Sequence, residues 1–207
     1  MPAQGLQALP PIHAAPPLLC SVIHRAFLLG LLLALIPACS DHAEPEQSGL
    51  DHAPRLVDLS QVQAELAQLE GQPYLLNFWA LWCAPCVAEM PALIEVAEEF
   101  ADQGLAFVTI NYDVMVPVDD IEGTLARVAE FQSQRGLDAA VLVYDADDYD
   151  GINDALQLPG PIPVTLAFDA TGQEVARIEG AAEHEQFREL ARTALGLTAA
   201  PASGSSQ

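Results

Sequence analysis

The sequence predicts an α/β domain in which a mostly parallel sheet lies between layers of helices. Three short apolar runs, each bounded by turn residues, are typical of buried strands and lie at 74–79, 105–111 and 139–144. Segments with the apolar spacing of amphipathic helices separate these runs, and strands that alternate with helices favour a parallel sheet. At 207 residues the chain has room for one such domain with a proper core, in addition to a leader.

A short helix is expected before the first strand. Ser60 and Gln63 have the spacing of a capping box, and Gly71 is placed to end the helix. The apolar residues between them fall on one stripe, which consists of Val62, Leu66 and Leu69.

The first strand leads directly into a longer helix. Tyr74 to Trp79 form the buried run, and helical spacing begins after Cys86. The apolar stripe of this helix consists of Val87, Met90, Leu93, Ile94, Ala97 and Phe100. Pro91 lies inside the helix and is expected to kink it, because proline cannot donate a hydrogen bond to the carbonyl of Val87.

Two more helices are expected on either side of the third strand. Asp119 or Asp120 is placed to cap a helix that ends at Gly136. A shorter helix is expected over Gly151–Leu158, after the strand at 139–144.

The end of the domain is expected to form a hairpin and a last helix. A strand at Val164–Phe168 is followed by a turn at Asp169–Gly172 and a second strand at Glu174–Ile178. An amphipathic helix is then expected over His184–Leu195.

Cys83 and Cys86 lie where the strand at 74–79 turns into the first turn of a helix. Free backbone N–H groups and the positive end of the helix dipole stabilise an anion there, which lowers the pKa of a thiol. Cys86 is one turn away on the same face, within the separation that a disulfide tolerates. Pro85 suits an early helix position, where its missing N–H loses no partner. We therefore expect Cys83 to be the exposed attacking thiol and Cys86 the more buried resolving thiol.

A structural disulfide and half of a zinc site are the alternatives for this pair. Zinc needs about four ligands, and the sequence has no second C-x-x-C motif and no cysteine downstream. A structural bridge over so short a loop would constrain the unfolded chain little. The aspartates between positions 145 and 150 do not fit the register of a calcium loop, so we expect no bound metal.

The residues around the cysteine pair resemble the thioredoxin superfamily. The motif is Asn-Phe-Trp-Ala-x-Trp-Cys-x-Pro-Cys from Asn77 to Cys86, followed by x-x-Glu-x-Pro. More narrowly, it is similar to the TlpA/ResA-type (DsbE-like) extracytoplasmic thiol–disulfide oxidoreductases, because thioredoxin itself usually carries aspartate at the position of Asn77. The similarity covers roughly Leu56 to Leu195. It implies a thioredoxin-like fold, with helices on both faces of a mostly parallel sheet and an antiparallel C-terminal hairpin.

The resemblance also implies roles for residues near the motif. The Cys83–Cys86 dithiol would cycle as a redox-active disulfide, with no other cofactor. A glutamate just after the second cysteine is an active-site acid/base in this branch, which matches Glu89. A carboxylate in partly apolar surroundings has a raised pKa, which suits that role; a helix-surface glutamate is the alternative. Trp82 is expected to shield the site, with Trp79 in the core.

A cis-proline opens the strand that faces the cysteine pair in this superfamily, and the match is Pro163, preceded by Ile162. The backbone edge exposed there can pair with an extended substrate segment. Pro159 and Pro161 crowd the same loop, and a rigid loop with every proline trans is the alternative. The expected substrate-binding residues are Trp82, Pro85, Ile162 and Pro163.

The chain is strongly acidic. Acidic residues outnumber basic ones 29 to 7, every one of those basic residues is arginine, and the formal net charge is −22. This charge argues against nucleic acid or an anionic membrane surface as a direct partner. We interpret the acidity as a solubilising surface, and steering of basic partners is the alternative.

Residues 1–39 are predicted to be a leader. His24 and Arg25 precede an apolar run at 26–36 that is too short to span a membrane and fits the h-region of a signal. Leu35 to Cys39 resembles the lipobox of bacterial lipoproteins, which implies a lipid on the Cys39 thiol. An ordinary secretory signal and an uncleaved anchor are the alternatives.

The remaining chain divides into three parts. Residues 40–55 are polar and acidic with proline and glycine, as in a flexible linker. The thioredoxin-like domain is expected over 56–197, and a disordered tail over 198–207. Each interpretation of the leader places the domain outside the cytoplasm, on the periplasmic side.

We therefore expect a membrane-tethered thiol–disulfide oxidoreductase that exchanges disulfides or dithiols with client proteins. The resemblance favours reduction of client disulfides, for example in cytochrome c maturation, with a membrane thiol as the electron donor. One alternative is a peroxiredoxin-like thiol peroxidase, although such sites resemble Thr-x-x-Cys and position 80 is alanine. The other alternative is a non-catalytic lipoprotein docking module.

Overall fold

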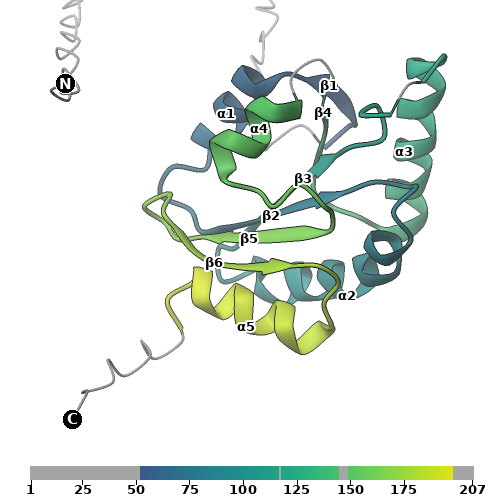
Figure 1. The fold of residues 1–207 in the computed structure, drawn as a ribbon. Helices are drawn as coiled ribbons and strands as arrows, with labels where there is room; N and C mark the ends of the chain where they lie inside the picture. Colours follow the sequence, from purple (N-terminus) through teal and green to yellow (C-terminus); the bar gives the residue numbers. More distant parts are fainter. Residues whose placement is uncertain (1–51, 117, 145–148, 198–207) are drawn as a thin grey trace, which may run out of the picture. The chain divides into compact units, whose positions relative to one another are not determined.

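The computed structural model describes residues 52–116, 118–144 and 149–197 (Figure 1). The predicted leader with Cys39, most of the predicted linker and the predicted tail lie outside these residues, as does the chain at 145–148. In the part of the chain that the structure describes, no helix is both long and apolar enough to cross a bilayer.

A single sheet forms the centre of the described domain. Its strands are β1 (Arg55–Val57), β2 (Tyr74–Trp79), β3 (Ala106–Asn111), β4 (Ala140–Tyr144), β5 (Val164–Phe168) and β6 (Glu174–Glu179). They lie in the order β1-β4-β3-β2-β5-β6. Neighbours from β1 to β2 pair in parallel, whereas β5 pairs antiparallel with both β2 and β6. The expected parallel sheet with an antiparallel C-terminal hairpin is confirmed.

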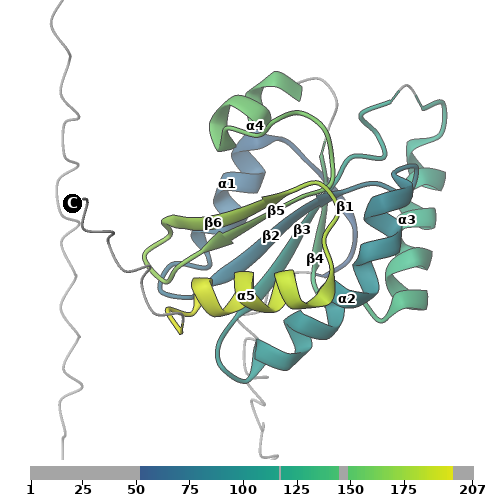
Figure 2. The ribbon, with the colours of Figure 1, turned by 60° about the horizontal axis from the view of Figure 1, so that its bottom comes forward.

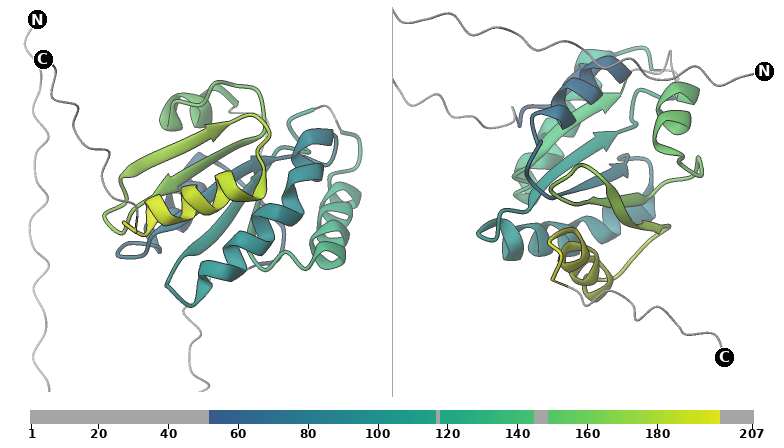
Figure 3. Two further views of the ribbon diagram at one scale, coloured as in Figure 1. Left: turned by 90° about the horizontal axis from the view of Figure 1, so that it is seen from below. Right: turned by 90° about the vertical axis from the view of Figure 1, so that its left-hand side faces the viewer.

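Helices cover both faces of this sheet. They are α1 (Leu59–Ala67), α2 (Ala84–Ala101), α3 (Ile121–Arg135), α4 (Tyr149–Leu156) and α5 (His184–Ala194). Figures 1 and 3 show α1 and α4 on one face and α2 and α5 on the other. In Figure 2 α3 lies next to α2, as expected when two right-handed crossovers, β2–α2–β3 and β3–α3–β4, follow each other in one direction.

Strand β2 is the centre of the hydrophobic core. All its residues are buried, because strands pair on both of its edges and helices cover both of its faces. Trp79 is fully buried, as predicted, and its ring packs on Phe131 of α3 with 5.0 Å between centroids. Side chains alternate along a strand, so Phe78 points to the other face, where its ring lies 5.8 Å from that of Tyr112.

Strand β1 was not expected from the sequence. It is three residues long and pairs with β4 at the edge of the sheet. Only Val57 in it is buried, so the segment carries no alternating apolar pattern that could reveal a strand. The strand begins at Arg55, one residue before the predicted start of the domain.

The predicted capping box of the first helix is wrong. The N-cap of α1 is Asp58, whose Oδ1 accepts a hydrogen bond of 2.8 Å from the backbone N–H of Gln61. In return, the Gln61 side chain accepts a 2.9 Å hydrogen bond from the backbone N–H of Asp58. Ser60 is already inside the helix, and its hydroxyl donates to Asp58 Oδ1. The carboxylate two residues earlier therefore forms the box that Ser60 and Gln63 were expected to form.

The other helices lie close to their expected positions. Asp120, and not Asp119, caps α3 by accepting a 2.8 Å hydrogen bond from the N–H of Gly123. Gly136 ends α3 with a φ of 65°, a conformation that glycine adopts without a steric penalty. Helix α2 is continuous through Pro91, so the expected kink does not interrupt it.

The functional segments meet at one end of the strands. The parallel strands β2 and β3 have their carboxyl ends there. Because β5 runs antiparallel to β2, its first residues lie at the same end, and Val164 pairs with Phe78. The segment after β2, which carries Cys83, therefore faces the segment before β5, which carries Pro163.

Candidate active site

Cys83 and Cys86 form a disulfide at the start of α2, with 5.3 Å between their Cα atoms. Cys83 is the N-cap residue, and Cys86 lies in the first turn on the buried side of the helix. Cys83 keeps 5% of its surface exposed and Cys86 none. Cys86 is therefore the more buried of the two, as predicted, but Cys83 is itself buried in the disulfide form and is not the exposed residue that was expected.

The helix start provides a donor to the Cys83 sulfur. The backbone N–H of Cys86 donates a hydrogen bond to Cys83 Sγ at 3.3 Å. Pro85 lies in the first turn, where a backbone N–H has no intrahelical acceptor. Proline therefore loses no hydrogen bond there by lacking an N–H. A backbone donor and the positive end of the helix dipole both favour a thiolate on Cys83 once the disulfide is reduced.

The segment before β5 forms the opposite wall of the site. The Ile162–Pro163 peptide bond is cis, as predicted for this position. The Ile162 carbonyl oxygen lies 3.9 Å from Cys83 Sγ. The predicted substrate-binding residues Ile162 and Pro163 are thus brought next to Cys83 by the pairing of β5 with β2.

Glu89 is buried on α2, one turn after Cys86, with 6% of its surface exposed. One of its carboxylate oxygens accepts a 2.9 Å hydrogen bond from the backbone N–H of Ala182. Burial raises the pKa of Glu89 to about 7, and the hydrogen bonds from Ala182 and from the Asn77 side chain limit this rise. The glutamate is therefore not on the helix surface, and its proton exchanges near neutral pH.

Asn77 joins the three elements around Glu89. It lies on β2 with 1% of its surface exposed, and its Nδ2 donates to Thr165 Oγ1 of β5 at 2.9 Å. Its Oδ1 is buried and has no hydrogen-bond partner among the described residues. Asn77 is neutral, whereas an aspartate at this position would place a second negative charge near Glu89.

A second polar pair holds the chain just before Cys83 and was not expected from the sequence. Asp113 Oδ2 accepts hydrogen bonds from the backbone N–H of Leu81 at 2.9 Å and from Asn111 Nδ2 at 2.7 Å. Asn111 Oδ1 in turn accepts one from the backbone N–H of Asp113 at 3.0 Å. These residues end β3 or follow it. Polar residues at the carboxyl end of a parallel strand are the signal that could have revealed them.

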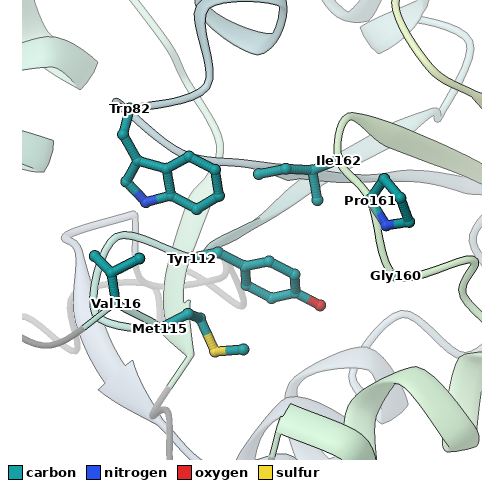
Figure 4. Close-up of a pocket in the computed structure, with 7 residues that line it drawn as sticks. All are labelled: Trp82, Tyr112, Met115, Val116, Gly160, Pro161 and Ile162. Carbon is teal, nitrogen blue, oxygen red and sulfur yellow. The ribbon is translucent and has the colours of Figure 1, made fainter.

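An apolar groove, lined among others by Trp82, which precedes Cys83 in the chain, and by Ile162, is shown in Figure 4. Trp82, which is 52% exposed, forms one end. Figure 4 shows the Tyr112 ring between Trp82 and Ile162 above and Met115 below. The groove has a volume of about 400 Å³ and is lined by Trp82, Tyr112, Met115, Val116, Gly160, Pro161 and Ile162.

The described ranges hold no candidate metal centre. No three histidine, cysteine, aspartate or glutamate side chains in them converge in a way that could hold a metal ion.

The arrangement of a helix-capping cysteine, a resolving cysteine and a facing cis-proline can be compared with known proteins. A family model described as the AhpC/TSA family matches residues 51–185. The chain belongs to the AhpC/TSA family. The matched range includes all the active-site residues described above.

Two relatives of the AhpC/TSA chain are thiol–disulfide oxidoreductases by name. The thiol-disulfide oxidoreductase ResA of Bacillus thuringiensis (strain Al Hakam) is 30% identical over 137 residues, which cover 65% of this chain and 72% of that protein. ResA of Oceanobacillus iheyensis is 34% identical over 125 residues, which cover 60% of this chain and 57% of that protein.

A solved structure shares the fold. A thiol:disulfide interchange protein of the thioredoxin family from Chlorobium tepidum TLS aligns with a TM-score of 0.52 and 27% identity. The alignment covers 63% of this chain and 84% of that one. The thioredoxin-like fold and the enzyme class predicted from the sequence, a thiol–disulfide oxidoreductase, are confirmed by these relationships. The roles of individual residues stay predictions.

Proposed function

We propose that this protein is a membrane-tethered, extracytoplasmic reductase of client protein disulfides. The observation that carries the proposal is the Cys83–Cys86 pair at the start of α2, with the buried Glu89 one turn further on. The first sulfur has a backbone donor, and the carboxyl group has a pKa of about 7. These are the groups that a two-step disulfide exchange requires.

In the first step the reduced protein attacks its client. The Cys83 thiolate forms a bond to one sulfur of the client disulfide, and the other client sulfur leaves as a thiolate that takes up a proton. The client segment lies along the edge beside Ile162 and Pro163, where extended backbone can pair. Trp82 and Pro85 complete the proposed docking surface beside the sulfur.

In the second step the protein releases its client. Cys86 attacks the Cys83 sulfur, so the Cys83–Cys86 bond forms and the mixed disulfide breaks. Glu89 accepts the proton of Cys86 and supplies a proton to the departing client thiolate. Two electrons have then passed from the protein to the client. A partner dithiol, which we propose is a membrane thiol donor, returns the protein to its reduced form.

The proposed location rests on the leader sequence. The apolar run at 26–36 and the Leu35-Ile36-Pro37-Ala38-Cys39 segment support export and lipid attachment at Cys39. The polar segment at 40–55 would separate the domain from the bilayer. Apocytochrome c is one client that would fit this location, and its maturation is the role that we propose to test first.

Trapping of mixed disulfides tests the two cysteine roles. The reduced Cys86→Ser variant should accumulate a covalent complex with a disulfide-bonded client, because the resolving thiol is absent. Cys83→Ser should accumulate none. Non-reducing gel electrophoresis and mass spectrometry of the linked peptides measure both, and equal trapping by the two variants would reject the assignment.

A peroxide assay separates the proposal from a peroxidase. The residue three positions before Cys83 is Ala80, whose methyl group has no hydroxyl for a bound peroxide, and it is fully buried. The reduced protein should consume a disulfide client much faster than hydrogen peroxide. A faster reaction with peroxide would favour the peroxidase, and a dithiol that reacts with neither would favour a docking module.

A further inference from the structure

Two residues that line the apolar groove, Trp82 and Ile162, are neighbours of the attacking cysteine. Trp82, at one end, precedes Cys83 in the chain, and Ile162, in the wall, places its carbonyl oxygen 3.9 Å from Cys83 Sγ. The segment after β3 contributes Met115 and Val116 to the groove, and Val116 is 42% exposed. Exposure of such an apolar surface to water is unfavourable, and exposed apolar patches therefore often mark binding sites.

The segments that build the groove carry no positive charge. None of the seven arginines lies between 56 and 126 or between 136 and 176, and the chain has no lysine. All residues that line the groove belong to these two stretches. Three exposed acidic side chains follow Val116 closely in the chain, namely Asp119, Asp120 and Glu122. The groove is therefore lined by apolar residues, and the chain that continues from Val116 carries exposed carboxylates and no basic residue before Arg127.

We infer that the groove seats a bulky apolar side chain of the client segment whose cysteine exchanges with Cys83, and that this segment is positively charged. The inference rests on the proposed function and names the class of client that the site selects. The apolar walls match the side chain, and the carboxylates in the chain that follows Val116 match basic residues next to it.

Strand geometry fixes which client residue enters the groove. In an extended segment, neighbouring side chains point to opposite sides, and residues two apart point to the same side about 7 Å from each other. The client cysteine must point toward Cys83. The side chain that enters the adjoining groove is therefore two residues from that cysteine, and the residue next to the cysteine points away.

Kinetics with synthetic disulfide peptides test this specificity on the reduced full chain. The peptides share one intramolecular disulfide and differ only in leucine or serine two residues from the attacked cysteine, and in arginine or glutamate at their ends. We expect kcat/KM to be about tenfold higher for leucine than for serine. Leucine placed one residue from the cysteine should give no such gain. Arginine ends should be preferred over glutamate ends, and added salt should reduce this preference.

A matched pair of variants locates the effect. Val116→Ser should lower the leucine-to-serine ratio of kcat/KM at least threefold. Ile121→Ser is the control, because Ile121 is 44% exposed, close to the 42% of Val116, but does not line the groove. This variant should leave the ratio as it is in the parent protein.

Other outcomes of these experiments would contradict the inference, the proposed function or both. Equal rates for all peptides, or preference for glutamate ends, would overturn the inference and leave the reductase function standing. Failure to reduce any peptide would overturn both. A dimer seen by sedimentation that Val116→Ser dissociates and Ile121→Ser does not would assign the groove to a second copy of the chain, and would also overturn the inference.

Discussion

Glu89 shows how burial turns an ordinary carboxyl group into a proton carrier. On a helix surface it would stay ionised at neutral pH, but between α2, β2 and the Ala182 backbone its pKa rises to about 7. The two hydrogen bonds it receives are too few to offset the loss of water. Because of this burial, a carboxyl group that can take up and release a proton near neutral pH lies one helical turn from the resolving cysteine.

Substitution of Glu89 tests the proton-transfer role. In the parent protein, the rate of the second step should rise with pH through about 7, as Glu89 becomes ionised and able to accept the Cys86 proton. Glu89→Gln should lack this rise and be slower by about 10²-fold near pH 8. Single-turnover release of a client from the mixed disulfide measures the rate, and superimposable pH profiles would remove Glu89 from the mechanism.

Stability against pH supplies the control that the variant is folded and that the pKa is shifted. The pKa of Glu89 is higher in the folded chain than its usual 4.5, so the folded state holds this proton more tightly. Its contribution to stability is fully present below about pH 4.5 and is lost as the pH rises through 7. Glu89→Gln should therefore gain stability over the parent protein by on the order of 3 kcal/mol between these pH values in urea unfolding.

At the scale of elements, the start of α1 is held by one capping box. Asp58 and Gln61 exchange hydrogen bonds between their side chains and backbones. The hydrogen bond from Ser60 is the largest cause that holds the pKa of Asp58 below its usual value, so the cap stays ionised at neutral pH.

Removal of this cap should destabilise the domain measurably. Asp58→Ala should lower the free energy of unfolding by about 1 kcal/mol, because the Gln61 N–H loses its acceptor. Gln61→Ala should have a smaller effect of the same sign. Gln63→Ala is the matched control, since the capping box does not use it, and urea unfolding of all three variants gives the comparison. A larger loss for Gln63→Ala than for Gln61→Ala would contradict the observed cap.

Most elements could be predicted because their residues carry strong local signals. The run Tyr74–Trp79 is apolar except for Asn77 and follows the turn residues Gly71 and Pro73, and Gly136 and Asp120 mark the ends of α3. The strand that the sequence did not reveal is β1. Strand β1 is short and lies at an edge, so pairing with β4 stabilises it and its own pattern does not reveal it.

The site was predictable only in part for a related reason. Cys83, Cys86 and Glu89 lie close together in the chain, so helical spacing alone indicates that they are neighbours. The Asn111–Asp113 pair and the groove depend on contacts between β2, β3 and the loop before β5. Such contacts are set by the order of strands in the sheet, which local spacing does not contain.

At the scale of the whole molecule, charge is the dominant feature. The formal net charge is −22, and several of the described arginines form ion pairs, such as Arg188 with Glu99, at 2.7 Å, and Arg177 with Glu174, at 2.6 Å. Ion pairs that solvent still reaches contribute little each. Most acidic groups therefore repel one another across the surface, which opposes the compact state.

Added salt should stabilise the domain. Raising sodium chloride from about 0.02 M to about 0.5 M shortens the range of charge repulsion and should increase the free energy of unfolding by on the order of 1 kcal/mol at pH 7. Urea unfolding at both salt concentrations measures this change. Near pH 4.5 the carboxylates are partly protonated, so the salt effect should be smaller there, and an equal or larger effect would contradict this account of the charge.

The pairing of β2 with β5 also determines when a client can first be held. Cys83 and its helix belong to a part of the chain that is made early, whereas the wall from Gly160 to Pro163 is made much later. Contacts between segments so distant in sequence close a long loop and form late in folding. A newly made chain thus contains both sulfurs before it has anywhere to dock a substrate, and the ability to select clients appears only when the last strands have joined the sheet.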